Sequence, residues 1–121
     1  MVATYDLDEP FIRVGPEEAE RLVALGAALV DVREPGEFSQ GHIPGSRLAP
    51  LGRLLADPRS ALAPELARVD TAEDAGAIFV CAVGVRSAVA AEMAATVGLR
   101  KVYNLDGGLS AWARSGLPVE S

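Results

Sequence analysis

The strongest constraint on the fold is one stretch in which an apolar run ends on the only cysteine and continues through glycine into helix-forming residues: Ile78-Phe79-Val80-Cys81-Ala82-Val83-Gly84-Val85-Arg86-Ser87. Residues 77–80 form a short, continuous apolar run, which is typical of a fully buried strand. Residues 87–95 are dense in strong helix formers, alanine above all. The stretch therefore predicts a strand, a loop and a helix, with Cys81 at the carboxyl end of the strand.

The position of Cys81 indicates a reactive thiol. In an open α/β sheet, ligands bind outside the carboxyl ends of the strands, where the N–H groups that begin the next helix point. Such a site stabilises a thiolate, because the positive end of the helix lowers a cysteine pKa from about 8.5 to roughly 3.5–7.5. Arg86 would add a positive charge, Gly84 lets the backbone turn several N–H groups toward one sulfur, and Ser87 is a candidate helix cap. The alternative is a small buried apolar residue with no chemistry.

The whole-chain properties exclude several classes of protein. A chain of 121 residues suits one domain, and its net charge of -6, with no basic stripe, argues against a nucleic-acid partner. One cysteine excludes an intramolecular disulfide, and no apolar stretch is long enough to span a membrane. The N-terminal residues lack a basic and hydrophobic signal pattern, so we expect a cytoplasmic location.

Short apolar runs alternate with helix-forming segments along the chain. We expect strands at 11–14, 27–30, 46–49, 77–80 and 101–105, and helices at 16–25, 50–56, 64–69, 86–97 and 109–115. Residues 1–10 are expected to be an extended or loosely ordered lead-in, and Asp57-Pro58-Arg59 to separate two helical pieces. This order predicts an α/β fold with a mostly parallel sheet of about five strands, covered by helices on both faces.

Two further groups of polar residues follow the strand at 27–30. Asp31 and Arg33 would form an ion pair or orient the loop around Cys81, and a solvated surface pair is the alternative. His42 lies in a turn with two glycines and a proline, where a ring nitrogen can bond a loop carbonyl. We assign it a structural role, because an ionised thiol needs no base to activate it. One cysteine and one histidine far apart in sequence give no recognisable metal ligand set.

Three motifs together resemble those of single-domain rhodaneses, the sulfurtransferases that carry sulfur as a cysteine persulfide. The loop CAVGVRS at 81–87 resembles the C-x-x-G-x-R-S active-site loop of that family. Residues 31–38 and 41–46 resemble its D-V-R-x-x-x-E-(F/Y) and G-H-I-P-G-(A/S) segment, and residues 105–112 its closing L-x-G-G-x-x-x-W. The resemblance implies a three-layer rhodanese-like fold in a single domain over 1–121, with its core at about 10–118. It also implies that Asp31, Arg33 and His42 have a structural role near the site.

The resemblance implies a sulfurtransferase that moves sulfane sulfur from thiosulfate or a persulfide to a thiophilic acceptor through a Cys81 persulfide. The loop residues Ala82, Val83, Gly84, Val85, Arg86 and Ser87 would bind the substrate, with inward N–H groups holding the anionic sulfur. Arg86 would either attract an anionic donor or pair with a carboxylate, and we favour the pairing. The reaction needs no metal or other cofactor. Cyanide, a thiol, thioredoxin and a sulfur-carrier protein are the candidate acceptors.

Departures from the family pattern leave the donor and two rival functions open. Ala82 and Val83 are apolar, whereas relatives active on thiosulfate often carry basic or polar side chains there, so a protein or glutathione persulfide is an alternative donor. A dual-specificity phosphatase of the related fold would have arginine six positions after the cysteine, where this chain has Ser87. A noncatalytic docking module often lacks the cysteine that this chain keeps.

Overall fold

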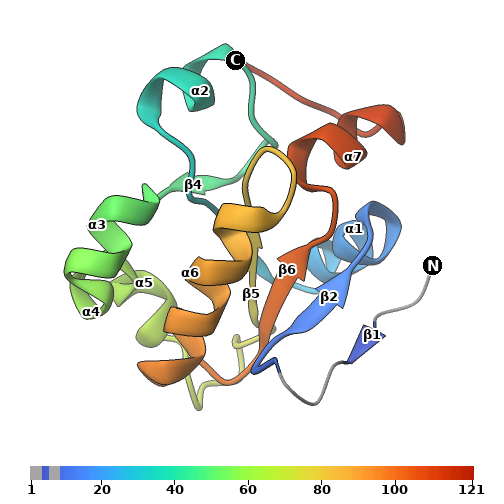
Figure 1. Cartoon of the computed structure of the whole chain (residues 1–121). Coiled ribbons are helices and arrows are strands. Elements are labelled where there is room, and N and C mark those ends of the chain that lie inside the picture. The colour runs from blue at the N-terminus through green and yellow to red at the C-terminus, as the bar shows by residue number, and fades with distance from the viewer. Residues whose placement is uncertain (1–3, 6–8) are drawn as a thin grey trace.

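Short hydrophobic strands form the centre of the molecule and helices cover both of its faces (Figure 1). The computed structural model describes residues 4–5 and 9–121. Within them one sheet has the strand order β1-β2-β6-β5-β3-β4. The strands are β1 (Thr4–Tyr5), β2 (Ile12–Val14), β6 (Val102–Leu105), β5 (Ala77–Val80), β3 (Ala28–Asp31) and β4 (Arg47–Leu48). Every pairing is parallel except that of β1 with β2.

The sheet confirms the predicted fold class. The five parallel strands are those expected from the sequence, with ends shifted by a residue or so. The antiparallel edge strand β1 lies in the segment expected to be an extended lead-in. The rest of that lead-in, at 1–3 and 6–8, lies outside the described residues.

Two hydrophobic cores lie on opposite faces of the sheet. One packs α1 (Pro16–Ala24) and α7 (Gly108–Arg114) through the buried Ala19 and Trp112. The other packs four helices, α3 (Leu51–Ala56), α4 (Pro58–Ala61), α5 (Ala63–Leu66) and α6 (Val85–Thr96). Strand β5 supplies Ile78 to the first core and Phe79 to the second. Its residues are all buried, as the continuous apolar run predicted.

The remaining helix, α2 (Pro35–Gln40), lies near the carboxyl ends of the strands, on the same side of the molecule as the loop between β5 and α6 (Figure 1). The C-terminal residues run from α7 across to the end of α2, where Glu120 forms an isolated antiparallel bridge with His42. The loop is thus flanked by α2 and by α7.

Two local predictions were wrong. Asp57 and Pro58 do not merely separate helices but start α4, because the Asp57 carboxylate accepts a hydrogen bond from the Ser60 N–H and proline fits the first helical turn. Ser87 does not cap α6, which begins two residues earlier, after Gly84. The Ser87 side chain is buried and takes part in the site described below.

N–H groups of helix α7 bind carbonyl groups of the loop after β5. The Leu109 and Ser110 N–H groups donate to the Cys81 and Ala82 carbonyls, at 2.8 and 3.1 Å. Gly108 permits this approach, because a Cβ at that position would lie only 2.4 Å from the Cys81 carbonyl oxygen. Its φ of +59° is also in the left-handed region. With these carbonyls occupied by α7, the N–H groups of the loop are left to face the sulfur.

The approach of α7 to the loop predicts a large effect of Gly108→Ala. We expect a loss of about 3 kcal/mol or more in the free energy of unfolding, because overpacking against backbone adds to backbone strain. Gly52→Ala is the matched control: Gly52 is in α3, and an added Cβ would have no neighbour within 4 Å. It should leave stability unchanged or raise it by up to about 1 kcal/mol. Urea unfolding measures both variants, and equal effects would contradict the account.

Candidate active site

Cys81 follows the last residue of β5, as predicted, and its side chain is nearly enclosed, with 1% of the residue exposed. The Gly84 N–H donates to the Cys81 Sγ at 3.0 Å. Gly84 reaches this position with φ +100°, and a Cβ there would lie 3.3 Å from the Gly107 nitrogen and the Leu105 carbonyl oxygen. The loop therefore packs closely against the turn between β6 and α7, and glycine suits both the conformation and the space.

The surroundings of Cys81 favour the thiolate. Burial raises the pKa of the thiol, but hydrogen bonds outweigh it: one from the Ser87 hydroxyl, and others from the N–H groups of Ser87, Gly84 and Val83. The pKa of Cys81 therefore lies below its ordinary value. The loop provides the convergent donors that the sequence predicted, although Ser87 contributes from inside α6.

A second buried residue, Asn104 of β6, completes the polar contacts under the loop. The Ser87 Oγ lies 3.3 Å from the Cys81 Sγ and 2.6 Å from the Asn104 Oδ1. The Asn104 Nδ2 donates to the Gly84 carbonyl at 3.1 Å. The sequence analysis missed Asn104. Its signal was a polar residue inside the apolar strand at 101–105, since a buried amide requires hydrogen-bond partners.

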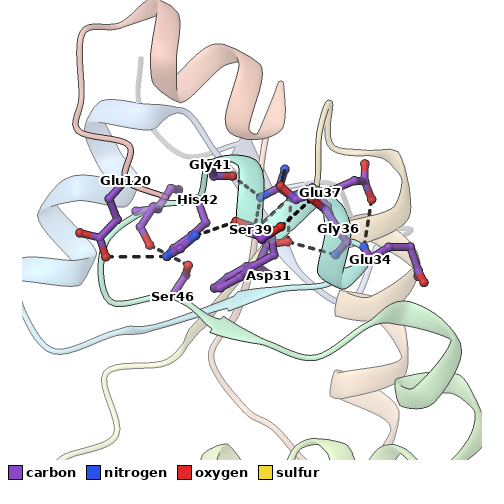
Figure 2. Close-up of polar contacts among 12 residues, drawn as sticks. Asp31, Glu34, Gly36, Glu37, Ser39, Gly41, His42, Ser46 and Glu120 are labelled. Atoms are coloured by element: carbon purple, nitrogen blue, oxygen red, sulfur yellow. Dashed lines mark hydrogen bonds and ion pairs between the residues drawn. The ribbon is translucent and has the colours of Figure 1, made fainter.

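Arg86 pairs with a carboxylate, the second of the two arrangements considered for it. Its two terminal nitrogens lie 2.8 and 3.0 Å from the carboxylate oxygens of Glu37 on α2. This contact, with the Glu34 N–H bond that closes the capping box of α2, lowers the pKa of Glu37 to about 2. Figure 2 shows Glu37 reaching back to Glu34. Glu37 is therefore ionised at neutral pH, and the pair joins the start of α6 to α2.

Asp31 and Arg33 form a buried ion pair at the end of β3, with 1% and 5% of each residue exposed. The Arg33 Nε and Nη2 lie 3.0 and 2.9 Å from the Asp31 carboxylate oxygens, and Nη2 also donates to the Gly41 carbonyl at 2.7 Å. The alternative of a solvated surface pair is therefore wrong. The pair anchors the C-terminal end of α2 to the sheet, which is a scaffold role.

His42 lies between α2 and the C-terminal residues (Figure 2). Its Nδ1 donates to the Phe38 carbonyl at 2.8 Å, and its ring stacks on Phe38 with centroids 3.8 Å apart. Its backbone N–H and carbonyl bond Glu120 at 2.7 and 2.8 Å. The role is structural, as predicted, but the ring nitrogen binds a carbonyl of α2 and not one of a loop.

An open cleft of about 420 Å³ lies between α2 and α7. Its walls are Arg33, Glu37 and Gln40 on one side and Leu109, Ala113 and Val119 on the other. Val83 of the loop and Val85, the first residue of α6, are 60% and 70% exposed. The loop thus presents apolar side chains to solvent, whereas the α2 side of the cleft is polar and charged.

Two searches of the described residues bear on other chemistries. In residues 4–5 and 9–121, no three His, Cys, Asp or Glu side chains are grouped so that they could hold a metal ion. No helix in this part of the chain is both long and apolar enough to cross a membrane.

Comparison with known proteins identifies the family. The family model of the Rhodanese-like domain matches residues 15–115. Thiosulfate sulfurtransferase GlpE of Pseudomonas aeruginosa (strain LESB58) is 36% identical over 115 residues, which cover 95% of this chain and 94% of that protein. The uncharacterized protein YqhL of Bacillus subtilis (strain 168) is 33% identical and covers 93% of this chain and 81% of its own. A rhodanese-related protein from Thermoplasma volcanium superposes with a TM-score of 0.71 at 27% identity, over 89% of this chain and 96% of that one.

The chain therefore belongs to the rhodanese family, as its three motifs predicted. The relatives named thiosulfate sulfurtransferase match it over nearly their whole length, so the prediction of a rhodanese-type sulfurtransferase agrees with them.

The donors around Cys81 predict an alkylation rate that depends on folding. The rate of reaction with iodoacetamide follows the thiolate and rises with pH through the pKa of Cys81. In the folded protein the midpoint of this rise should lie below about 8.5, the value of an unperturbed cysteine. The same chain unfolded in urea is the control and should titrate near about 8.5. Equal midpoints in the two states would contradict the assigned hydrogen bonds.

Proposed function

We propose that the protein moves sulfane sulfur from a donor to a thiophilic acceptor through a persulfide on Cys81, without a metal or organic cofactor. The observation that supports this most directly is the Cys81 sulfur at the end of β5, facing the Gly84 N–H and the Ser87 hydroxyl, with its pKa lowered by them. A thiolate there is ready to attack without a general base.

The first half of the reaction loads the sulfur. The Cys81 thiolate attacks the outer sulfur of thiosulfate, and a new S–S bond forms as the donor's S–S bond breaks. Sulfite leaves with the electron pair, and the negative charge of Cys81 passes to the outer sulfur of the persulfide. The inward N–H groups of the loop, among them those of Val83 and Gly84, stabilise this charge, as an oxyanion hole does.

The second half returns the enzyme to its starting state. Cyanide or a thiolate attacks the outer sulfur and forms thiocyanate or a new persulfide. The electron pair of the broken S–S bond returns to Cys81 as its thiolate. Each half-reaction conserves charge and needs no external oxidant or reductant. The sulfur donor and the sulfur acceptor react at the same site, one after the other. The steady state is therefore ping-pong.

The surface around the sulfur favours a persulfide donor over thiosulfate. Val83 and Val85 are the exposed side chains of the loop, and its only cation, Arg86, is paired with Glu37. A dianionic donor gains little from these groups, whereas the organic part of a persulfide can contact the valines. Glutathione persulfide or a protein persulfide is therefore the donor class we propose, with thiosulfate as a slower substitute.

The remaining assignments rest on chemistry and charge. The acceptors we propose are a thiol or cyanide, with thioredoxin or a sulfur-carrier protein as the protein candidates. A cysteine used as a thiolate has to stay reduced, which supports a cytoplasmic location. The net charge of -6 supports the absence of a nucleic-acid partner. We also propose that residues 1–121 act as one rhodanese domain.

The loop supports sulfur transfer over phosphate hydrolysis. A phosphatase loop would need an arginine at the sixth position after the cysteine. Here that position is Ser87, whose hydroxyl faces Cys81 and Asn104, while Arg86 binds Glu37. A phosphate dianion would have no free guanidinium, whereas one sulfur anion is served by the N–H groups and the hydroxyl.

Steady-state kinetics test the proposal. With cyanide as acceptor, double-reciprocal plots at several donor concentrations should give parallel lines for thiosulfate and for glutathione persulfide. We expect kcat/KM for glutathione persulfide to be higher by about tenfold or more, because tenfold corresponds to only about 1.4 kcal/mol of differential binding. Hydrolysis of p-nitrophenyl phosphate should be at background.

The matched variant is Cys81→Ser, which keeps the size of the side chain and removes the thiolate. It should lose sulfur transfer from both donors while its unfolding midpoint stays close to that of the parent protein. Transfer retained by this variant, or its absence from the folded parent with either donor, would contradict the proposal. The second result would favour the docking module.

A further inference from the structure

The buried side chains of Cys81, Ser87 and Asn104 form a closed ring of polar contacts with the partly buried backbone of Gly84. The Gly84 N–H and the Ser87 Oγ both face the Cys81 Sγ, at 3.0 and 3.3 Å. Asn104 contacts the same two residues from β6: its Oδ1 lies 2.6 Å from the Ser87 Oγ, and its Nδ2 lies 3.1 Å from the Gly84 carbonyl oxygen. Ser87 is 0% exposed and Asn104 is 2% exposed, so bulk water does not compete for the contacts of the Ser87 hydroxyl with Asn104 and Cys81.

The bonding capacity of these groups fixes which of them donates. The Gly84 carbonyl can only accept, so the amide nitrogen of Asn104 faces it and the amide oxygen faces Ser87. That oxygen can also only accept, so the 2.6 Å contact requires the Ser87 proton. A hydroxyl has one proton, and Ser87 therefore cannot donate to Asn104 and to Cys81 at the same time.

The charge of Cys81 decides where this proton goes. A neutral thiol can donate its own proton to the Ser87 oxygen, which leaves the hydroxyl proton on Asn104. A thiolate has no proton to give, so Ser87 has to turn its proton to the sulfur, and the Asn104 oxygen loses its donor. We propose that Asn104 is a positioning residue that competes with Cys81 for the single proton of Ser87, and so favours the states in which the Cys81 sulfur is uncharged.

This inference rests on the proposed function for its catalytic meaning. In the persulfide the negative charge lies on the outer sulfur and the Cys81 sulfur is uncharged, so the Ser87 proton can return to Asn104. Asn104 therefore favours the loaded enzyme over the free thiolate. It also keeps the pKa of Cys81 from falling further, and a thiolate of higher pKa is the better nucleophile toward the donor.

The charged groups around the loop stay the same when Asn104 is changed. Arg86 on α6 interacts with the charge of Cys81 and is bound to Glu37 of α2. Asp31, which also acts on Arg86, is paired with Arg33 after β3. None of these contacts includes Asn104, so a fall in the Cys81 pKa on its substitution reports on the Ser87 proton.

The test is a double-mutant cycle of Asn104→Leu and Ser87→Ala, read as the pH midpoint of Cys81 alkylation by iodoacetamide. Asn104→Leu should lower the pKa of Cys81 by about half to one unit, the equivalent of one ordinary hydrogen bond. Ser87→Ala should raise it. In the Ser87→Ala background Asn104→Leu should give no fall, because no proton is left to redirect.

A purely structural role of Asn104 gives the opposite sign. Loss of its bond to the Gly84 carbonyl would loosen the loop, move the N–H donors away from the sulfur and raise the pKa of Cys81. A rise on Asn104→Leu, or an equal fall with and without Ser87, would therefore overturn the proposal. Circular dichroism and urea unfolding show whether each variant folds, and Asn104→Ala, which needs no extra room, takes the place of Asn104→Leu if that variant does not.

The readout also separates this inference from the proposed function. Alkylation of Cys81 needs no sulfur donor, so the cycle gives an answer in a protein that transfers no sulfur. Conversely, a failed cycle leaves the persulfide mechanism intact. If the cycle and the persulfide mechanism both hold, stopped-flow loading of Cys81 by glutathione persulfide should be slower in Asn104→Leu, because a thiolate of lower pKa is a weaker nucleophile. Discharge of the persulfide to cyanide should be faster, because a thiolate of lower pKa is a better leaving group.

Discussion

A sulfur anion enclosed at the end of a buried strand is stable only where hydrogen-bond donors converge on it, and the rest of the structure serves that convergence. The donors are backbone N–H groups of the loop and one hydroxyl, that of Ser87. They face inward because the Cys81 and Ala82 carbonyls are bound from outside by α7, which comes close enough only through Gly108. A parallel sheet supplies the geometry, since it places the ends of β5, β6 and β3 at one edge.

Ion pairs hold the elements around this loop. Glu37 joins α2 to the start of α6 through Arg86, and Arg33 joins the C-terminal end of α2 to β3 through Asp31. His42 then ties α2 to the C-terminal residues (Figure 2). These contacts use the charged residues of the family motifs for positioning and leave the chemistry to Cys81. The exposed Val83 and Val85 are the basis for the donor class that we propose.

The features that could be predicted from the sequence are those that depend on local patterns of residues. The apolar run at 77–80 marked β5, and the order of short strands and helices marked the parallel sheet. Three motifs marked the family. The sequence could not show which residues meet when the contact joins distant segments. Arg86 and Glu37 are 49 positions apart, and Ser87 and Asn104 are 17 apart. The capping role of Asp57 was a local signal, because an aspartate followed by proline is a favourable start for a helix as well as a break in one.

The measurement that tests the central claim most directly is the intact mass of the protein after incubation with glutathione persulfide or thiosulfate and removal of the excess donor. The account predicts a gain of one sulfur atom that cyanide or a thiol removes and that Cys81→Ser does not show. A folded protein with a free thiol that gains no sulfur from either donor, or a gain that persists in Cys81→Ser, would contradict it.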